Sequence, residues 1–422
     1  MTPAGPARSQ VRAPARDQAA APAAKPALDI AALLTDPATR IVVTCGSGGV
    51  GKTTTAAAMA VLAADAGRTV AVLTIDPARR LAQSMGLTEL DNTPRRVQVD
   101  PELNPESDTA GELWAMMLDT RRTFDEMVAA HSTPERAEQI LANPFYQTIS
   151  SSFSGTQEYM AMEKLGQLSA TGRYDLIVVD TPPSRSALDF LDAPQRLSAF
   201  LDGRMIRLLA TPGRGVMKLV GAGFTLFAKA VTAVIGGQML ADAARFVQLF
   251  EDMFGGFRER AEATYRLLRD AGSSFVVVAT CEADALREAS YFADRLLTER
   301  MPLAGLVLNR THPPLVDLPL ATAEAALDEW GATPAGSSPP GGPAASPSPS
   351  PSASNAVALA GAALRIHADR LAIRAQELRM RTRFDRAHPE IPVVEVPARP
   401  TDVHDIPGLR AVGAALTGDT TP

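Results

Sequence analysis

One stretch, residues 41–67, constrains this chain more than any other; it reads IVVTC-GSGGVGKT-TTAAAMAVLAADAG. Ile41–Cys45 is a short apolar run, which predicts a buried strand of a parallel sheet. The next eight residues fit G-x-x-x-x-G-K-[ST], the phosphate-binding loop, and the Ala-rich segment after them predicts a helix that ends near Gly67. The loop therefore has a strand before it and a helix after it, as phosphate binding requires.

The residue types of this loop explain its chemistry. Lys52 can bridge the β- and γ-phosphates, and the Thr53 hydroxyl can hold Mg²⁺. Val50 and Thr54 complete the candidate nucleotide-binding segment. Backbone N–H groups can turn toward phosphate oxygens because four positions are glycine, namely Gly46, Gly48, Gly49 and Gly51.

The alternative is a glycine-rich turn that binds nothing. The chain's preference for arginine argues against it, because a lysine is kept in the loop where a compact ammonium group is useful. The lysines of the chain are Lys25, Lys52, Lys164, Lys218 and Lys229.

Composition narrows the class of protein. A chain of 422 residues with 46% apolar residues predicts two or three domains, or one large domain with insertions. A net charge of −6 argues against a general nucleic-acid-binding protein. Cys45 and Cys281 are too few for a disulfide framework or a thiolate zinc site, and the N-terminus lacks the apolar region of a signal peptide. These features predict a cytoplasmic protein.

The chain divides into one domain and two Pro-rich stretches. Residues 1–28 are predicted to be disordered, residues 29–418 form the domain, and residues 334–355 form a flexible Pro/Ser linker within a surface loop. Helical insertions are predicted at about 106–170 and 196–270. The predicted strands are Ile41–Cys45, Val70–Ile75, Arg96–Val99, Asp175–Asp180, Ser274–Thr280, Ala304–Asn309 and Val393–Val396. This pattern predicts an α/β fold with a doubly wound, mostly parallel sheet and an α-helical subdomain formed by the two insertions.

The second insertion contains the most apolar segment of the chain, Val216–Leu240. A membrane span is one interpretation. Lys218, Lys229 and several glycines favour instead an amphipathic, mobile helix that lines a groove, with peripheral membrane contact left open.

Methionines gather in the two insertions. Their flexible side chains suit a surface that accepts varied apolar partners, and the alternative is ordinary core packing. They are Met116, Met117, Met127, Met160, Met162, Met205, Met217, Met239 and Met253.

Polar groups follow three further predicted strands. Asp76 comes directly after Val70–Ile75, Asp180 ends Asp175–Asp180, and Asn309 ends Ala304–Asn309. Ligands bind at the carboxyl ends of the strands in such sheets. The alternative for the two aspartates is capping of the following turn. We therefore expect Asp76, Asp180 and Asn309 to lie beside the phosphate-binding loop.

Together these motifs resemble the arsenite-pump-type ATPases, the ArsA family, which includes the targeting factor for tail-anchored membrane proteins. The matching segments are G-x-G-G-V-G-K-T-T, T-x-D-P-A at 74–78, Y-D-L-I-V-x-D-T-x-P at 174–183 with F-L-x-x-P after it, the G-x-x-E segment at 155–158, V-L-N at 307–309, and a last strand that ends near Pro397. The resemblance covers about residues 38–330 and 390–415. It implies an ATP-hydrolysing dimer that uses Mg²⁺.

The resemblance also implies roles for single residues. Asp76 would position the attacking water, Asp180 would hold Mg²⁺ through a coordinated water, Asn309 would contact the adenine edge, and Pro397 would pack on the base. The phosphates and Mg²⁺ would be bound by Gly48, Gly49, Gly51, Lys52, Thr53 and Thr54.

The sequence also departs from the family pattern at positions that bear on function. The family usually carries a second loop lysine, which reaches the partner's nucleotide, at the position of Ser47, and a histidine at the position of Ser186. The zinc-binding C-x-x-C of the targeting factor and the cysteines of arsenite sensing are absent. Arsenite transport and zinc-bridged dimerisation are therefore not expected.

Three functional hypotheses follow. The first is a dimeric ATPase whose cycle opens and closes a hydrophobic groove for apolar protein segments. The second is one half of a heterodimer, or a low-activity regulatory subunit, whose paralogous partner supplies the loop lysine that Ser47 replaces. The third is a non-hydrolysing scaffold. Dimeric ATPases of cell division or DNA partition fit the large insertions poorly.

Overall fold

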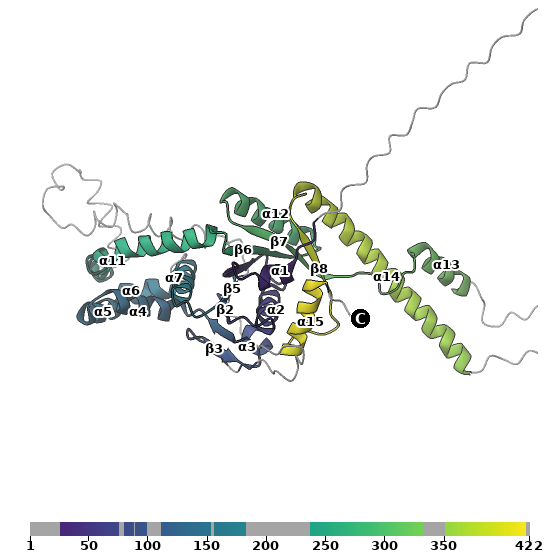
Figure 1. Cartoon of the computed structure of the whole chain (residues 1–422), viewed down its shortest axis with the longest axis horizontal. Coiled ribbons are helices and arrows are strands. Elements are labelled where there is room, and N and C mark those ends of the chain that lie inside the picture. Colours follow the sequence, from purple (N-terminus) through teal and green to yellow (C-terminus); the bar gives the residue numbers. More distant parts are fainter. Residues whose placement is uncertain are drawn as a thin grey trace, which may run out of the picture.

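An eight-stranded sheet forms the centre of the computed structural model, which describes residues 26–75, 80–87, 89–98, 111–152, 156–182, 237–331 and 351–418. The strand order is β3-β4-β2-β5-β1-β6-β7-β8, and Figure 1 shows the sheet at the centre of the molecule. The pairing of β3 with β4 at one edge is antiparallel, and the other pairings of this sheet are parallel. The strands are β1 (Ile41–Cys45), β2 (Val70–Thr74), β3 (Arg95–Val97), β4 (Leu113–Met117), β5 (Leu176–Asp180), β6 (Ser273–Thr280), β7 (Leu303–Thr311) and β8 (Val393–Pro397). The predicted doubly wound, mostly parallel α/β fold is confirmed.

Helices cover the sheet because the strands are apolar on both faces. Helix α2 (Lys52–Asp65) packs against β1, β2 and β5, and its buried alanines allow it to lie close to the sheet. Helix α15 (Ile406–Thr417) packs on α2, and a two-pronged ion pair joins Arg410 to Asp65 with N–O distances of 2.8 and 2.9 Å. The other helices near the sheet are α1 (Ile30–Thr35), α3 (Arg80–Ser84) and α12 (Ala283–Thr298).

The strand order sets the place of the site. Strand β5 lies between β1 and β2, so Asp180 at its end is opposite Thr44 on one side and Thr74 on the other. The carboxyl ends of three strands therefore meet directly below the phosphate-binding loop.

Strand β4 corrects the sequence prediction, which assigned helix from about residue 106 to 170. Leu113–Met117 contains residues with good intrinsic helix propensity, but it pairs with β2 along its whole length. Burial beside a parallel strand outweighs the local preference.

Two predicted boundaries also differ. Residues 26–28, placed in the disordered tail, lie along β8: Ala27 bridges to Val393, and the buried Leu28 donates its N–H to the Val393 carbonyl. Residues 351–355, placed in the linker, begin helix α14 (Pro351–Ala387). The described structure therefore includes residues 26–28, and helix α14 includes residues 351–355.

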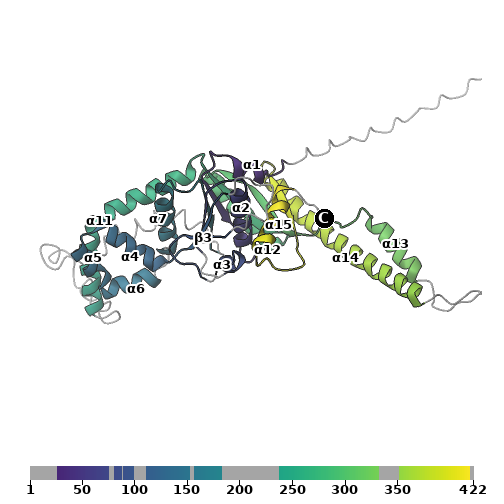
Figure 2. The same cartoon turned by 60° about the horizontal axis from the view of Figure 1, so that its bottom comes forward.

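A helical subdomain lies at one end of the sheet (Figures 1 and 2). Helix α11 packs on α5, α6 and α7, and the Asn143 amide donates to the Asp242 carbonyl at 3.0 Å. The members are α4 (Thr120–His131), α5 (Pro134–Leu141), α6 (Pro144–Ser152), α7 (Thr156–Ala170) and α11 (Gly237–Arg269). Residues 196–236 of the second insertion, and so most of Val216–Leu240, lie outside the described residues. Among the helices that are described, none has a stretch long and apolar enough to cross a membrane.

The described methionines of these insertions mostly pack in the core. Met116, Met127, Met160 and Met162 are at most 1% exposed. For these four residues, core packing is the correct interpretation rather than a flexible binding surface. Met205 and Met217 lie outside the described residues.

An arm of two helices, α13 (Leu320–Gly331) and α14, projects from the opposite end of the molecule (Figures 1 and 2). Hydrogen bonds and ion pairs fix the C-terminal half of α14 to the sheet. His312 Nδ1 lies 2.6 Å from Glu377 Oε1, and Arg374 Nη1 lies 2.7 Å from Glu395 Oε2. Arg381 also pairs with Glu395. The arm is therefore anchored beside β7 and β8.

Candidate functional site

At two positions of the phosphate-binding loop, neighbouring atoms leave no room for a side chain, so both residues are glycine. At Gly46, with φ of 151°, a Cβ would lie 2.1 Å from the Val278 carbonyl oxygen of β6. At Gly51, with φ of 96°, a Cβ would lie 2.2 Å from Asn309 Nδ2. The loop thus presents backbone N–H groups, at the start of α2, to any anion that occupies it.

Lys52 is held in the curve of this loop. Its side chain is buried, with the residue 5% exposed, and Nζ donates to the Ser47 carbonyl at 2.8 Å. The ammonium group is therefore already positioned inside the loop, where phosphate oxygens can replace part of its backbone contact.

Asp180 joins the loop to the sheet. The residue is 0% exposed, and Oδ2 accepts hydrogen bonds from Thr53 Oγ1 at 2.7 Å and Thr74 Oγ1 at 2.9 Å. Behind it, Thr181 Oγ1 donates to the Thr44 carbonyl at 2.7 Å. The predicted pair Thr53 and Asp180 is thus in direct contact.

This donor set fits Mg²⁺. A hydroxyl and a carboxylate are hard oxygen ligands, and Mg²⁺ in nucleotide sites is usually held by one or two such groups together with phosphates and waters. Thr53 lies at the N-terminal turn of α2, directly after Lys52, so the cation and the phosphates would share one edge of the site.

Asp76 lies outside the described residues, as does Ser186. The residue before it is placed: Ile75 N donates to the Asp180 carbonyl at 2.9 Å, and Gln157 Nε2 donates to the Ile75 carbonyl at 2.8 Å. Ile75, the residue before Asp76, is therefore held beside Asp180.

Sequence reasoning gave no role to Thr74 or Gln157. Thr74 stood inside the matched T-x-D-P-A segment, and Gln157 stood beside Glu158 in the G-x-x-E segment, so the motifs contained both residues. Their partners, Asp180 and Ile75, are distant in sequence, and only the sheet order brings them together.

Asn309 contacts the loop itself. Its Nδ2 donates to the Val50 carbonyl at 2.8 Å, and its Oδ1 accepts from Arg310 N at 2.9 Å. Pro397, at the end of β8, pairs with Thr311 and lines a cavity of about 560 Å³ beside α15. Lys52 and Asp180 do not line that cavity, so Pro397 belongs to a neighbouring part of the same edge.

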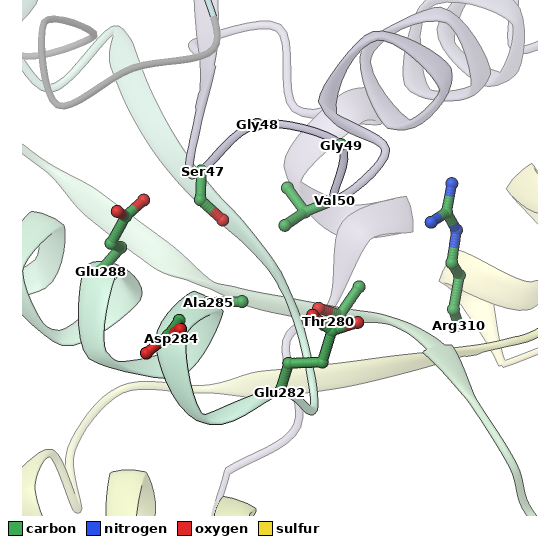
Figure 3. Close-up of a pocket in the computed structure, with 10 residues that line it drawn as sticks. All are labelled: Ser47, Gly48, Gly49, Val50, Thr280, Glu282, Asp284, Ala285, Glu288 and Arg310. Atoms are coloured by element: carbon green, nitrogen blue, oxygen red, sulfur yellow. The ribbon is translucent and has the colours of Figure 1, made fainter.

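A second cavity, of about 300 Å³, lies between the loop and the start of α12 (Figure 3). Ser47, Gly48, Gly49 and Val50 form one wall, and Arg310 closes one side. Acidic side chains extend from the other wall, namely Glu282, Asp284 and Glu288. The negative charges of these three carboxylates repel a phosphate group and attract a basic group. The cavity therefore favours a basic ligand. Sequence reasoning missed these residues, although they follow the end of a predicted strand.

The thiols of the chain are not activated. Burial is the main cause that raises the pKa of Cys45 to about 12, and the nearby Lys52 lowers it only in part. Burial, followed by the charges of Glu377 and Glu395, raises the pKa of Cys281 to about 12. Both side chains remain neutral thiols near neutral pH.

Comparison with known proteins gives a consistent group of relatives. The sequence profile of the anion-transporting ATPase family matches residues 39–319. ATPase GET3B of Arabidopsis thaliana is 27% identical over 280 residues, which are 64% of this chain and 63% of that protein. A putative arsenical pump-driving ATPase of Prosthecochloris vibrioformis is 30% identical over 162 residues, 38% of this chain and 36% of that protein. Protein Rv2184c of Mycobacterium tuberculosis is 31% identical over 179 residues, 39% of each chain. The matched region thus spans less than two thirds of the length of each of these three relatives.

Proposed function

The chain belongs to the anion-transporting ATPase family, and on that basis we propose that it binds ATP and hydrolyses it in a Mg²⁺-dependent reaction. The observation that carries this proposal is the contact of Thr53 with Asp180, beside a lysine already held inside the loop. A glycine-rich turn without a ligand has no reason to place a hydroxyl, a buried carboxylate and a buried ammonium group together.

Each group has one task in this proposal. Backbone N–H groups of residues 48–54 and the Lys52 ammonium bind the phosphates, while Thr53 and Asp180 hold the cation. Mg²⁺, when bound, neutralises charge that develops on the phosphate oxygens. Asp76 orients the attacking water, and Asn309 and Pro397 bind on the adenine side. Catalysis then depends on positioning and charge rather than on a covalent group.

Two variants test this assignment in full-length protein. Lys52→Ala should abolish binding of ATP, because the main positive charge of the loop is lost. Asp76→Asn should retain binding and lose Mg²⁺-dependent phosphate release. The matched control is Asp317→Asn, which neutralises an exposed carboxylate in the loop before α13. Turnover by Asp76→Asn at the rate of the control would refute the role of Asp76.

The proposed active form is a dimer, either of two copies or with a paralogue whose loop has a lysine in place of Ser47. Ser47 lies on the acidic cavity of Figure 3, which favours a basic side chain supplied from outside. A chain without that lysine would on its own be a slow ATPase or a regulatory subunit. Ser47→Lys should then raise turnover, with a rate that depends on protein concentration. An unchanged rate, and no paralogue in complexes isolated from cells, would contradict the heterodimer.

The proposed client is an apolar protein segment that binds beside the helical subdomain. Its basis is the apolar segment Val216–Leu240 of the sequence. Capture from native cells with the Asp76→Asn variant should enrich proteins with exposed apolar helices, relative to Lys52→Ala. Equal capture by the two variants would mean that any such binding is independent of ATP.

A further inference from the structure

Three of the large apolar side chains that helix α14 exposes are evenly spaced along it. Leu359 is 74% exposed, Ile366 is 64% exposed and Ile373 is 46% exposed. They are seven residues apart, so they lie within about 40° of one another around the helix and form a stripe about 21 Å long. The next residue in this series, Met380, packs against the core. The stripe is therefore the continuation, beyond the sheet, of a face that is buried further along.

The arm's internal contacts leave this stripe open. His367 Nε2 lies 2.8 Å from the Leu318 carbonyl oxygen, and Arg370 Nε donates to the Pro313 carbonyl at 2.7 Å. These contacts fix the loop before α13 to the flank of α14 that carries His367 and Arg370. The arm begins at residue 320, outside residues 39–319, which the family profile matches.

Charges beside the stripe are self-complementary. Arg365 and Asp369 are exposed on the same flank, and the described part of the chain forms no ion pair with either of them. In an antiparallel helix pair related by a twofold axis at Ile366, Leu359 faces Ile373 of the second helix. Asp369 then lies about 3 Å along the axis from Arg365 of the other helix, within reach of that long side chain.

We propose that the α14 stripe is a homodimer interface, in which two copies of this chain pair their α14 helices antiparallel around Ile366. The pairing removes three large apolar side chains of each copy from water and forms two symmetric Arg365–Asp369 ion pairs. A second copy of the chain thus covers the apolar side chains of the stripe and also pairs the charged side chains beside it. This interface is independent of the proposed ATPase chemistry.

The first test compares the oligomeric state of full-length variants by sedimentation and light scattering, without nucleotide. Ile366→Arg should raise the dimer dissociation constant on the order of a hundredfold, because it places two arginines at the centre of the interface. The matched control is Leu378→Arg, since Leu378 is 45% exposed on α14 but lies about 120° around the helix from the stripe. The control should remain dimeric.

The second test exchanges the charges. Arg365→Asp and Asp369→Arg should each weaken the dimer, because each places like charges opposite one another, and the double variant should restore it. Lys52→Ala should dimerise like the unaltered chain, so failure of the ATPase proposal would not be mistaken for failure of this one.

The third test locates the twofold axis. In a Cys281→Ser background, Ile366→Cys should form a disulfide-linked dimer with itself under mild oxidation. Leu359→Cys alone should not, but it should cross-link to Ile373→Cys when the two proteins are mixed. A monomeric chain, a dimer that is insensitive to Ile366→Arg, or equal self-cross-linking at 359 and 366 would each overturn the proposal. A monomer that forms the arm contact only with a paralogue would also overturn it.

Discussion

Asn309→Ala separates two roles that one side chain can have. The structure shows the Asn309 amide donating to the Val50 carbonyl of the phosphate-binding loop, whereas the sequence resemblance predicts contact with adenine. The hydrogen bond to Val50 should increase the affinity of every ligand that binds in the loop. The contact with adenine should increase the affinity only of ligands that have a base. Titration of ATP and of inorganic tripolyphosphate, each with Mg²⁺, distinguishes them.

The expected magnitude follows from the contact. A partly buried hydrogen bond of 2.8 Å between neutral groups contributes about 1 kcal/mol, which corresponds to about a fivefold change in an equilibrium constant. Without this hydrogen bond, the ligand itself must order the loop, and part of the binding free energy is lost in doing so. The dissociation constant of tripolyphosphate should therefore rise about fivefold. The constant for ATP should rise by at least the same factor, and the excess over tripolyphosphate measures the contact with the base.

Two controls make this comparison sharp. Asn309→Asp keeps the shape but places a carboxylate against the Val50 carbonyl, so it should weaken both ligands more than alanine does. Asn92→Ala breaks partly buried hydrogen bonds to Glu126 and Asp119, neither of which belongs to the loop, so it should lower thermal stability without changing either affinity. Calorimetry that gives an unchanged tripolyphosphate affinity for Asn309→Ala would refute the anchoring role.

Three more outcomes are expected. Arg68→Met should lower the free energy of unfolding by about 3 kcal/mol in urea titrations, because the buried guanidinium donates to the carbonyls of Leu34, Asp36, Thr39 and Asp175; a loss below about 1 kcal/mol would contradict this. Gly51→Ala should weaken ATP binding at least about tenfold, since its Cβ would meet Asn309 Nδ2 at a positive φ, and calorimetry that finds the affinity intact would show that the loop relaxes. Cys281 should react with iodoacetamide about a thousandfold more slowly at pH 8 than a thiol at the ordinary pKa of 9.0, because its raised pKa of about 12 leaves little thiolate. The same raised pKa lets only the unfolded thiol ionise between pH 9.0 and about 12, so its contribution to stability falls as the pH rises through that window.

The central sheet could be predicted because its strands are short apolar runs. Ile41–Cys45 matches β1 residue for residue, and the runs around Val72, Val178 and Val277 became β2, β5 and β6 within one residue at each end. The edge that carries Asp180 and Asn309 followed from the rule that parallel strands bind ligands at their carboxyl ends. Both predictions depend on local pattern alone.

The contacts that build the site could not be predicted in this way. The Asn309 amide and the Val50 carbonyl are 259 positions apart, and Thr74 and Asp180 are 106 positions apart. Strand order determines such contacts, and β4 shows how order can override propensity, because Leu113–Met117 becomes a strand only beside β2. Helix α14 was missed for a related reason. Its apolar residues are divided between an open stripe and other faces, so no single amphipathic pattern stands out.

The end of β7 connects the two halves of this molecule physically. Asn309 holds the phosphate-binding loop, and three residues later His312 is held by Glu377 of α14 through both its ring and its N–H. Between them, Thr311 is fixed by pairing with Pro397. The short segment from Asn309 to His312 is therefore bound to the phosphate-binding loop at one end and to the arm at the other, although the two partners are far apart in sequence.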